Sequence, residues 1–378
     1  MISLFQGSLL LLFSVSSSAE ELETAVEASV KLLLECQESL DGKGAPAEWP
    51  YEGVYREDGE IPPGYRVGGT AIAAWALIES PQYERSEDVR AAVRRGLGFV
   101  LAGLEGEAMD AGFSGGYDVR GWGHAYALNL MLEMRRRSIV PQDLTDEVDR
   151  RIAWLVETLE ATEIVERGGW NYSRRGGGEQ RADASPFMTA PTVLALWEAR
   201  RQGEEVAGAV LERALVALEA CRTEEGAFAY NTNNGMPTLP GAIARSPIAE
   251  LVLYTADRSS LEDVEFAVES FFEHWNELEA RRKKTGTHKP PHGVAPYYFF
   301  YGHYYASVAI EALPEESRRK WRVRYLDTLF SVREDSGGWN DRVFPRSEAF
   351  GTSMALLSLL EPTRRRPAAA VLPAASPR

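Results

Sequence analysis

A glycine-aromatic phrase that returns along the chain constrains the fold more than any other feature of the sequence. It reads AEWPY around Trp49, AGFSGGY around Phe113, GGWNY around Trp170, GAFAY around Phe228 and GGWND around Trp339. The aromatic anchors follow one another after 64, 57 and 58 residues and then after 111, which is close to two steps with one degenerate copy between them. This spacing predicts six repeats. Because one such unit cannot bury its apolar face alone, the fold must come from stacked units.

Two kinds of apolar pattern alternate between the phrases. The first has apolar residues at helical spacing among charged ones, which predicts helices with one face in water. It covers residues 20–37, 86–104, 142–161, 205–221, 260–282 and 314–332. The second is apolar on almost every side, which predicts helices enclosed by protein, and it covers residues 70–78, 125–134, 187–197, 247–254, 304–313 and 351–360. We therefore expect an all-α (α/α)6 toroid of six helix-pair repeats, without β-strands.

The two ends of the chain differ from this repeating body. An apolar run from Leu9 to Val15 is followed by small residues, with Ser17 and Ala19 placed as at a cleavage site, although no Lys or Arg precedes the run. We predict a signal peptide over residues 1–19, a toroid domain over 20–361 and a disordered Pro/Ala/Arg tail over 362–378. The protein is then exported, to the periplasm or the medium, with no membrane span in the mature chain. The alternative is an apolar N-terminal helix that is retained.

The net charge bears on the partners that the protein can bind, and the positions of the two cysteines bear on whether they form a disulfide. The net charge of −15 disfavours nucleic acid as a partner, because binding phosphates requires clustered Lys and Arg. Cys36 and Cys221 occupy equivalent places in repeats one and four, which lie opposite each other in a ring of six. Since a disulfide needs Cα atoms within about 7 Å, we expect both cysteines to be free, buried, small side chains.

Two of the phrases carry a resemblance to a known superfamily. RTEEGAF (222–228) and REDSGGW (333–339) match the spacing of the QxxxGxW repeat of squalene and oxidosqualene cyclases, with Arg in the place of Gln. The chain thus resembles the terpenoid cyclase and protein prenyltransferase superfamily over roughly residues 20–360. The resemblance implies an α-α toroid with an aromatic-lined central cavity. The DxDD motif, whose central acid protonates the alkene in class II cyclases, is absent. The DxC phrase of the zinc-binding prenyltransferases is absent too, and we expect neither a metal nor a cofactor.

An arginine comes just before the enclosed helix in five repeats. A cation at a helix N-terminus opposes the helix dipole, so each of these arginines needs an anionic partner. Either each one pairs within its own repeat, or together they form a ring at the barrel mouth that binds an anionic ligand. The five are Arg66, Arg120, Arg181, Arg245 and Arg346.

The fifth repeat departs from the pattern and reads HKPPHGVAPYYFFYGHYYA. Tyr297, Tyr301 and Tyr304 fall on one face of a helix, because their spacing is i, i+4 and i+7. They either line a cavity for a ligand or form packed aromatic core. His288 and His292 have a spacing found in metal sites, but the two prolines between them break the helix that such a site needs.

Three residues are candidates for a catalytic acid or base. His124 and His303 each lie at the start of an enclosed helix, where the alternative is a hydrogen-bonded structural histidine. Asp183 precedes another enclosed helix, and we expect it to act as an N-cap unless burial raises its pKa.

Function follows less directly from these patterns. We expect a toroid that binds an apolar or anionic ligand, or a protein partner, at the barrel mouth. Two enzyme classes remain as alternatives: an (α/α)6 polysaccharide lyase or glycosidase, and a terpene cyclase-like enzyme. A closed aromatic cavity over one acid would favour cyclisation, whereas a filled barrel would favour a scaffold.

Overall fold

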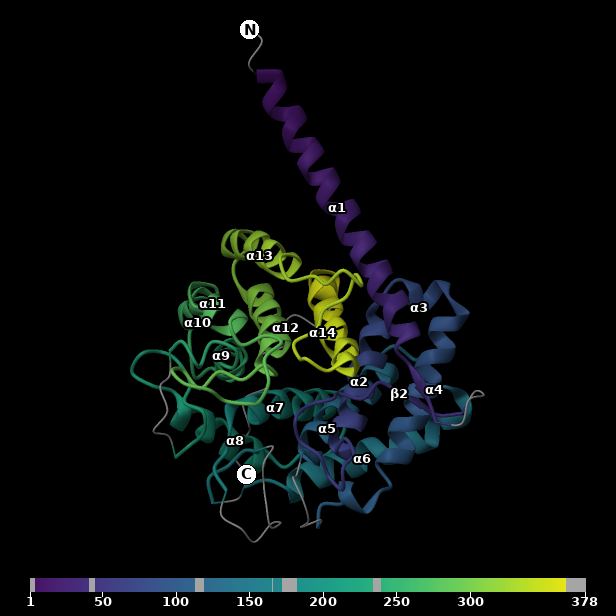
Figure 1. Cartoon of the computed structure of the whole chain (residues 1–378). Coiled ribbons are helices and arrows are strands. Elements are labelled where there is room, and N and C mark those ends of the chain that lie inside the picture. Colours follow the sequence, from purple (N-terminus) through teal and green to yellow (C-terminus); the bar gives the residue numbers. More distant parts are fainter. Residues whose placement is uncertain are drawn as a thin grey trace.

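A computed structural model describes residues 4–40, 45–112, 119–164, 166–171, 182–233 and 239–364, with side chains from residue 19 onward. Inner and outer helices alternate along this part of the chain (Figure 1). The inner helices are α2 (Pro63–Glu79), α5 (Arg120–Arg136), α7 (Pro186–Arg201), α9 (Ser246–Thr255), α12 (Tyr298–Ala312) and α14 (Glu348–Leu360). The outer helices are α1 (Leu4–Glu35), α4 (Glu87–Gly103), α6 (Thr145–Ala161), α8 (Gly208–Cys221), α10 (Leu261–Glu273) and α13 (Glu315–Phe330).

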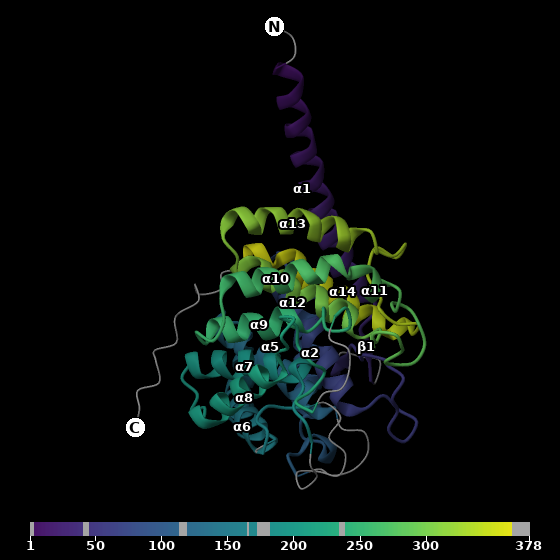
Figure 2. The same cartoon turned by 90° about the vertical axis from the view of Figure 1, so that its left-hand side faces the viewer.

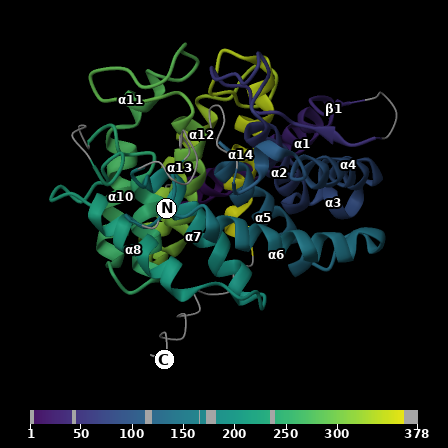
Figure 3. The same ribbon diagram turned by 90° about the horizontal axis from the view of Figure 1, so that it is seen from below.

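The inner helices form a closed ring. Each packs against the next inner helix in chain order, and α14 packs back against α2. Outer helices cover this ring: α4 contacts α2, α6 contacts α5, α8 contacts α7, α10 contacts α9, α13 contacts α12, and α1 contacts α14. Seen from below, α4, α8 and α10 lie at the rim, and α5, α7 and α14 lie nearer the centre (Figure 3). The predicted all-α (α/α)6 toroid is confirmed.

In three repeats the phrase ties an outer helix to the inner helix that follows it in the chain: α1 to α2, α6 to α7 and α13 to α14. The backbone N–H of the tryptophan donates to a threonine hydroxyl in the first half of the inner helix, and its indole N–H donates to a carbonyl in the last turn of the outer helix. The indole N–H gives this carbonyl a donor at the helix end, where carbonyls lie beyond the reach of the helix's own N–H groups. The N–H to Oγ1 pairs are Trp49–Thr70, Trp170–Thr189 and Trp339–Thr352, each 3.0 Å, and the indole acceptors are Leu33, Leu159 and Leu329 at 2.6, 2.8 and 2.9 Å.

The backbone conformation explains why the phrase contains a glycine. Gly168, Gly226 and Gly337 each stand two residues before the aromatic anchor and have φ values of 78°, 72° and 87°. Residues with a Cβ rarely adopt this left-handed conformation. At Gly168 a Cβ would also lie 2.1 Å from the carbonyl oxygen of Arg213. The turn therefore requires glycine at this place in each of these three repeats.

Three details differ from expectation. The connection after α1 folds back on itself, so Glu38–Ser39 (β1) and Ala47–Glu48 (β2) form a short antiparallel pair where no strand was expected. The helix expected over 260–282 is interrupted: α10 ends at Glu273, and α11 (Trp275–Glu279) follows as a separate turn. Both cysteines are free, but only Cys221 is buried, and Cys36 is half-buried at the end of α1.

Short elements complete the described chain. They are α3 (Gln82–Arg85) and the 3-10 turns η1 (Glu107–Met109), η2 (Gln142–Leu144), η3 (Pro345–Ser347) and η4 (Glu361–Thr363). The side chain of Arg364, directly after η4, is only 9% exposed. The packed body thus extends to Arg364, three residues beyond the expected boundary. The rest of the predicted tail, 365–378, lies outside the described residues.

Residues 4–19 of the segment predicted as a signal peptide form the first part of α1. This part of the helix extends away from the toroid, whereas the later part packs against α14 (Figures 1 and 2). In the described chain, no helix has the length and apolar character that crossing a membrane requires. A helical conformation is compatible with both a cleaved and a retained segment, so cleavage and export stay predictions.

Candidate functional site

Six aromatic side chains meet on the barrel axis at the end where the inner helices begin. Each is at most 8% exposed. We call this cluster the aromatic mouth, and it consists of Tyr51, Tyr65, Trp122, Phe187, Tyr297 and Phe350. The space between the rings is about 10 Å³, which is room for one water molecule.

The rings of the mouth pack against one another. The centroids of Tyr51 and Phe350 are 4.3 Å apart, and Tyr65 meets Trp122 edge-on at 5.5 Å. These separations are typical of favourable aromatic pairs. The aromatic lining expected from the resemblance is present, but it encloses no cavity of ligand size.

Below the mouth, tyrosines fill the barrel axis. Tyr301 is stacked on Phe187 at 4.0 Å and donates its hydroxyl to the Phe187 carbonyl at 3.0 Å. Deeper still, the hydroxyls of Tyr126 and Tyr305 lie 3.1 Å apart, and both side chains are buried. The three tyrosines predicted to share one helix face therefore have different places: Tyr297 lines the mouth, Tyr301 fills the axis, and Tyr304 lies at the opposite end.

A buried carboxyl group lies directly beside the mouth. Tyr51 donates its hydroxyl to Oδ2 of Asp341 at 3.2 Å, and the Asp341 side chain is fully buried. Burial raises the pKa of Asp341 to about 7, because the charged form loses its hydration. Oδ1 of Asp341 has no hydrogen-bond partner among the described residues. This group is thus able to hold or release a proton near neutral pH.

A buried cation accompanies this acid. The guanidinium carbon of Arg342 lies 5.9 Å from the ring centre of Tyr51 and 5.7 Å from that of Tyr297, two residues of the mouth. Its Nη1 donates to the carbonyl of Gly286 at 3.2 Å, and the side chain is 1% exposed. Arg342 therefore places positive charge beside the aromatic rings.

His288 borders the same cluster. Its Nε2 lies 3.1 Å from the hydroxyl of Tyr298 and 3.2 Å from that of Tyr297. Burial lowers the pKa of His288 to about 4, so the imidazole is neutral at pH 7. The histidine orients a mouth tyrosine rather than adding charge to the site.

The predicted arginines hold separate loops. Arg66 pairs with Glu48 at 2.5 Å, and Arg346 pairs with Glu38 across the junction between the last and first repeats. The other two donate to backbone carbonyls: Arg120 to that of Asp110, and Arg245 to those of Phe228 and Gly241 at 2.8 and 2.9 Å. Arg181 lies outside the described residues. None of the four described arginines is among the residues that line the mouth.

The two predicted histidines are buried within the helix packing. Nδ1 of His303 lies 2.7 Å from the Phe299 carbonyl, and its Nε2 accepts the indole N–H of Trp275 at 2.9 Å. Nε2 of His124 lies 2.9 Å from the Met109 carbonyl. Burial lowers the pKa of each to about 4, and neither histidine lines the mouth.

The predicted N-cap role of Asp183 is wrong. Helix α7 begins at Pro186, and the residue at its N-cap position is Ser185, whose side chain makes no capping hydrogen bond. Proline at the first helical position has no N–H to satisfy, which reduces the need for a cap. Asp183 is half-buried and lies 3.9 Å from Nε of Arg167.

Asp341 could have been found from a break in the repeat. The residue two places after the anchor is Tyr51 in the first phrase, Tyr172 in the third and Tyr230 in the fourth, but Asp341 in the sixth. Repeats one and six are neighbours in the closed ring, which brings this aspartate onto Tyr51. No group of three or more His, Cys, Asp and Glu side chains in the described chain has the arrangement of a metal site.

Comparisons with known proteins identify the fold. No protein-family model matches the chain, and no curated protein matches its sequence. The type II terpene cyclase MstE from Scytonema, solved with geranylgeranyl dihydroxybenzoate, is similar with a TM-score of 0.55 and 13% identity, over 93% of this chain and 98% of that one. The Lin0763 protein from Listeria innocua is similar with a TM-score of 0.53 and 12% identity, over 90% and 98%. This chain shares the α-α toroid fold with a terpene cyclase. At such identities the likeness concerns the fold alone.

Proposed function

We propose that the aromatic mouth binds a ligand that has an apolar face and an acidic group. The observation that carries this proposal is the position of Arg342, whose guanidinium lies within 6 Å of two of the six rings that line the mouth. Aromatic rings bind apolar faces, and a guanidinium binds carboxylates. An isoprenoid chain on an acidic ring and an oligosaccharide of uronic acids both have this chemistry.

The mouth must open to take such a ligand. Its free volume of about 10 Å³ is far below the roughly 300 Å³ at which small-molecule sites begin. Side chains at its edge, such as Tyr297, would have to rotate. If only a fraction of the molecules is open before the ligand binds, the apparent affinity is the affinity of the open form multiplied by that fraction. The same packing argues against a preformed closed cavity for terpene cyclisation.

Calorimetric titration of the purified chain tests this proposal. The probes are geranylgeranyl dihydroxybenzoate, an oligogalacturonide, and the uncharged geranylgeraniol as a control for the acidic group. We expect one of the acidic probes to bind, and Tyr297→Leu to weaken that binding by about tenfold or more. The matched control is Tyr304→Leu, which removes a tyrosine of α12 whose side chain points to the opposite end of the barrel, against Arg364 and Trp75, and which should bind as the wild type does. Equal binding by both variants, or binding of none of the probes, would contradict the proposal.

The raised pKa of Asp341 favours a second candidate, an acid–base enzyme at the same mouth. General acid–base catalysis near pH 7 is most efficient with a group whose pKa lies near 7, and Tyr51 links Asp341 to the lining of the mouth. A glycosidase of the usual kind needs two carboxylates, whereas no carboxylate is among the described lining residues. Among the enzyme classes considered, a lyase acting on a uronate therefore fits better than a glycosidase.

Turnover distinguishes an enzyme from a binding protein. The oligogalacturonide would be incubated with the protein, and unsaturated products would be sought by mass spectrometry. An enzyme should lose turnover in the Asp341→Asn variant and still bind the substrate. If the wild type binds the oligogalacturonide but forms no product, the mouth is a binding site and not an active site for this substrate.

We also propose that the chain is exported. The support is the apolar run from Leu9 to Val15, which is followed by small residues with Ser17 and Ala19 placed as at a cleavage site. Mass spectrometry of protein purified from its own host should find a mature N-terminus at Glu20. A chain that still begins at Met1 would contradict cleavage.

A further inference from the structure

A polar pocket lies at the opposite end of the barrel, where the inner helices end. Its volume is about 320 Å³, which falls in the range of small-molecule sites. The lining residues are Glu79 at the end of α2, Arg136 and Arg137 at the end of α5, and Thr363 and Arg364 after α14. We call this the arginine pocket. Tyrosines on the axis separate it from the aromatic mouth.

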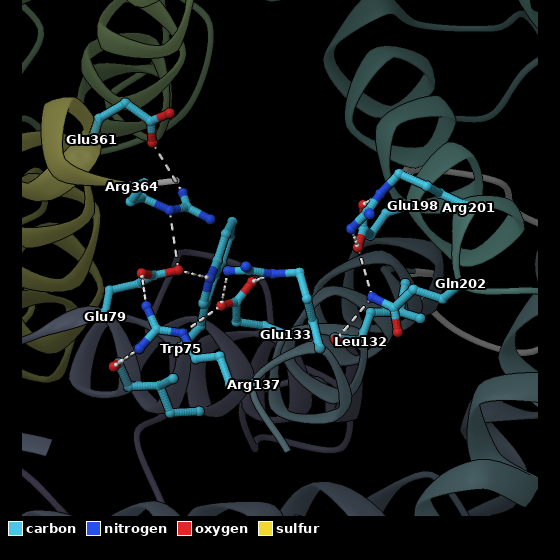
Figure 4. A network of polar contacts seen from close by, with 12 residues as sticks. Trp75, Glu79, Leu132, Glu133, Arg137, Glu198, Arg201, Gln202, Glu361 and Arg364 are labelled. Carbon is cyan, nitrogen blue, oxygen red and sulfur yellow. Dashed lines mark hydrogen bonds and ion pairs between the residues drawn. The ribbon is translucent and has the colours of Figure 1, made fainter. Parts of the chain in front are cut away.

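Arg364 is held rigidly in this pocket. Its Nε lies 3.0 Å from Oε1 of Glu79, and its Nη1 lies 3.0 Å from Oε2 of Glu361 (Figure 4). Nη1 also donates to the hydroxyl of Tyr304 at 3.1 Å. The guanidinium carbon lies 4.9 Å from the ring centre of Trp75. A side chain fixed by this many contacts loses little further entropy when it binds a ligand.

The two neighbouring arginines are also held by carboxylates. Arg137 donates to Glu79, to Glu133 and to the carbonyl of Ile78. Arg136 donates from Nε and Nη2 to the two oxygens of Glu133, at 3.1 and 2.5 Å. Glu133 thus neutralises charge behind the pocket, while the lining itself contains three arginines and one glutamate.

Two guanidinium nitrogens remain for a ligand. No hydrogen bond or ion pair joins Nη1 of Arg136 or Nη2 of Arg364 to the described part of the chain. Neither atom is among the buried polar atoms without a partner, and both belong to residues that line the pocket. Two N–H donors on arginines of one pocket suit an oxyanion, because guanidinium groups bind carboxylate and phosphate oxygens in pairs.

We propose that the arginine pocket is a binding site for the carboxylate or phosphate group of a small anion, independent of the aromatic mouth. Arg136 and Arg364 supply the free donors, and Glu79 and Glu133 fix the arginines in place. The pocket and the mouth share no residue, so either site can exist without the other.

Calorimetric titration of the full chain at constant ionic strength tests the site. The probes are inorganic phosphate and succinate, with chloride as the control for nonspecific screening. The test variant is Arg136→Gln, which leaves Glu133 paired with Arg137 and is expected to keep the thermal midpoint of the wild type. Loss of a hydrogen bond from a charged donor is expected to weaken binding by about tenfold.

Arg201→Gln is the matched control. Arg201 lies at the end of α7 and donates to both oxygens of Glu198 at 2.5 and 2.8 Å, as Arg136 does to Glu133, but it does not line the pocket (Figure 4). Its titrations should match those of the wild type. Preference for phosphate or for succinate names the ligand class. Equal loss in both variants, equal heats with chloride, or no binding of either anion would overturn the proposal.

Discussion

At Asp341, the cost of burying a carboxyl group determines its protonation. Burial raises the pKa of this carboxyl group, whereas the hydrogen bond from Tyr51 and the positive charges of Arg342 and Arg282 lower it. The effect of burial is larger, and the pKa rises to about 7. The folded protein therefore holds a proton that the unfolded chain, with a pKa near 3.8, has already released. Such a group makes the folded state less stable as pH rises from about 4 to about 7.

Replacing Asp341 with asparagine should remove this pH dependence. The unfolding free energy of Asp341→Asn, relative to the wild type, is expected to rise between about pH 4 and pH 7, by roughly 1.4 kcal/mol for each unit in which only the folded form is protonated. Urea unfolding at several pH values measures the difference. A difference that does not change with pH would show that the carboxyl group titrates normally.

His124 should behave in the opposite sense. Burial lowers its pKa from 6.5 to about 4, so the unfolded chain binds the extra proton and the folded protein loses stability as pH falls from 6.5 towards 4. His124→Asn should therefore gain stability relative to the wild type on acidification. The same urea series measures it, and each variant serves as the control for the other. Equal slopes for the two variants would contradict both assignments.

At the scale of the helices, the sequence pattern predicts that a helix is present more accurately than it predicts the residues at which the helix begins and ends. Each of the twelve expected helices is present, but α2 begins at Pro63 rather than at residue 70. The glycines near its start resemble a turn in the sequence. In the structure they permit close packing: a Cβ on Gly68 would lie 2.4 Å from the ring of Trp122, and one on Gly64 would lie 2.4 Å from the carbonyl oxygen of Val119. Only the neighbouring helix reveals this role.

The site was less predictable, for a physical reason. The aromatic residues of the mouth lie in the repeated phrase or at the starts of inner helices, and the sequence pattern locates both. The pairing of Tyr51 with Asp341 joins residues 290 positions apart, and the burial that raises the pKa of Asp341 depends on the closed ring. His124 and His303 show the converse, because the sequence marks them as chemically capable and burial keeps them neutral.

The threonine that accepts the tryptophan N–H should matter for stability in each repeat that has one. Thr189→Val leaves the buried N–H of Trp170 without its acceptor, and the expected loss of unfolding free energy is about 1–3 kcal/mol. Thr192→Val is the control, because Thr192 is also buried in α7 but only donates to the carbonyl of Met188. Urea unfolding measures both variants, and equal losses would refute the role of the phrase.

For the whole molecule, closure of the ring joins the first and last repeats. Helix α1 packs against α14, Arg346 pairs with Glu38, and Ser347 donates its hydroxyl to the carbonyl of Glu52 at 2.5 Å. An open solenoid can lose a terminal repeat and keep the rest, because each repeat contacts only its neighbours. In a closed ring every inner helix has two inner neighbours, so no repeat is terminal.

Removal of the last inner helix should therefore affect the entire domain. A chain truncated before Glu348 exposes the faces of both α12 and α2, and we expect it to lose the cooperative unfolding transition of the full-length protein. Far-UV circular dichroism and tryptophan fluorescence during urea unfolding report the outcome. The full chain should give coincident transitions with both probes, whereas a truncated chain with one sharp transition would show that closure is dispensable.

The tyrosines on the axis close the centre of the barrel, so its two ends are separate surfaces. With Tyr126, Tyr301 and Tyr305 buried between the ends, no solute passes from one side to the other through the centre. Substitutions that alter what one side recognises then leave the other side unchanged. The two sides are therefore free to diverge separately, because residues at one end can be replaced without a change in the surface at the other.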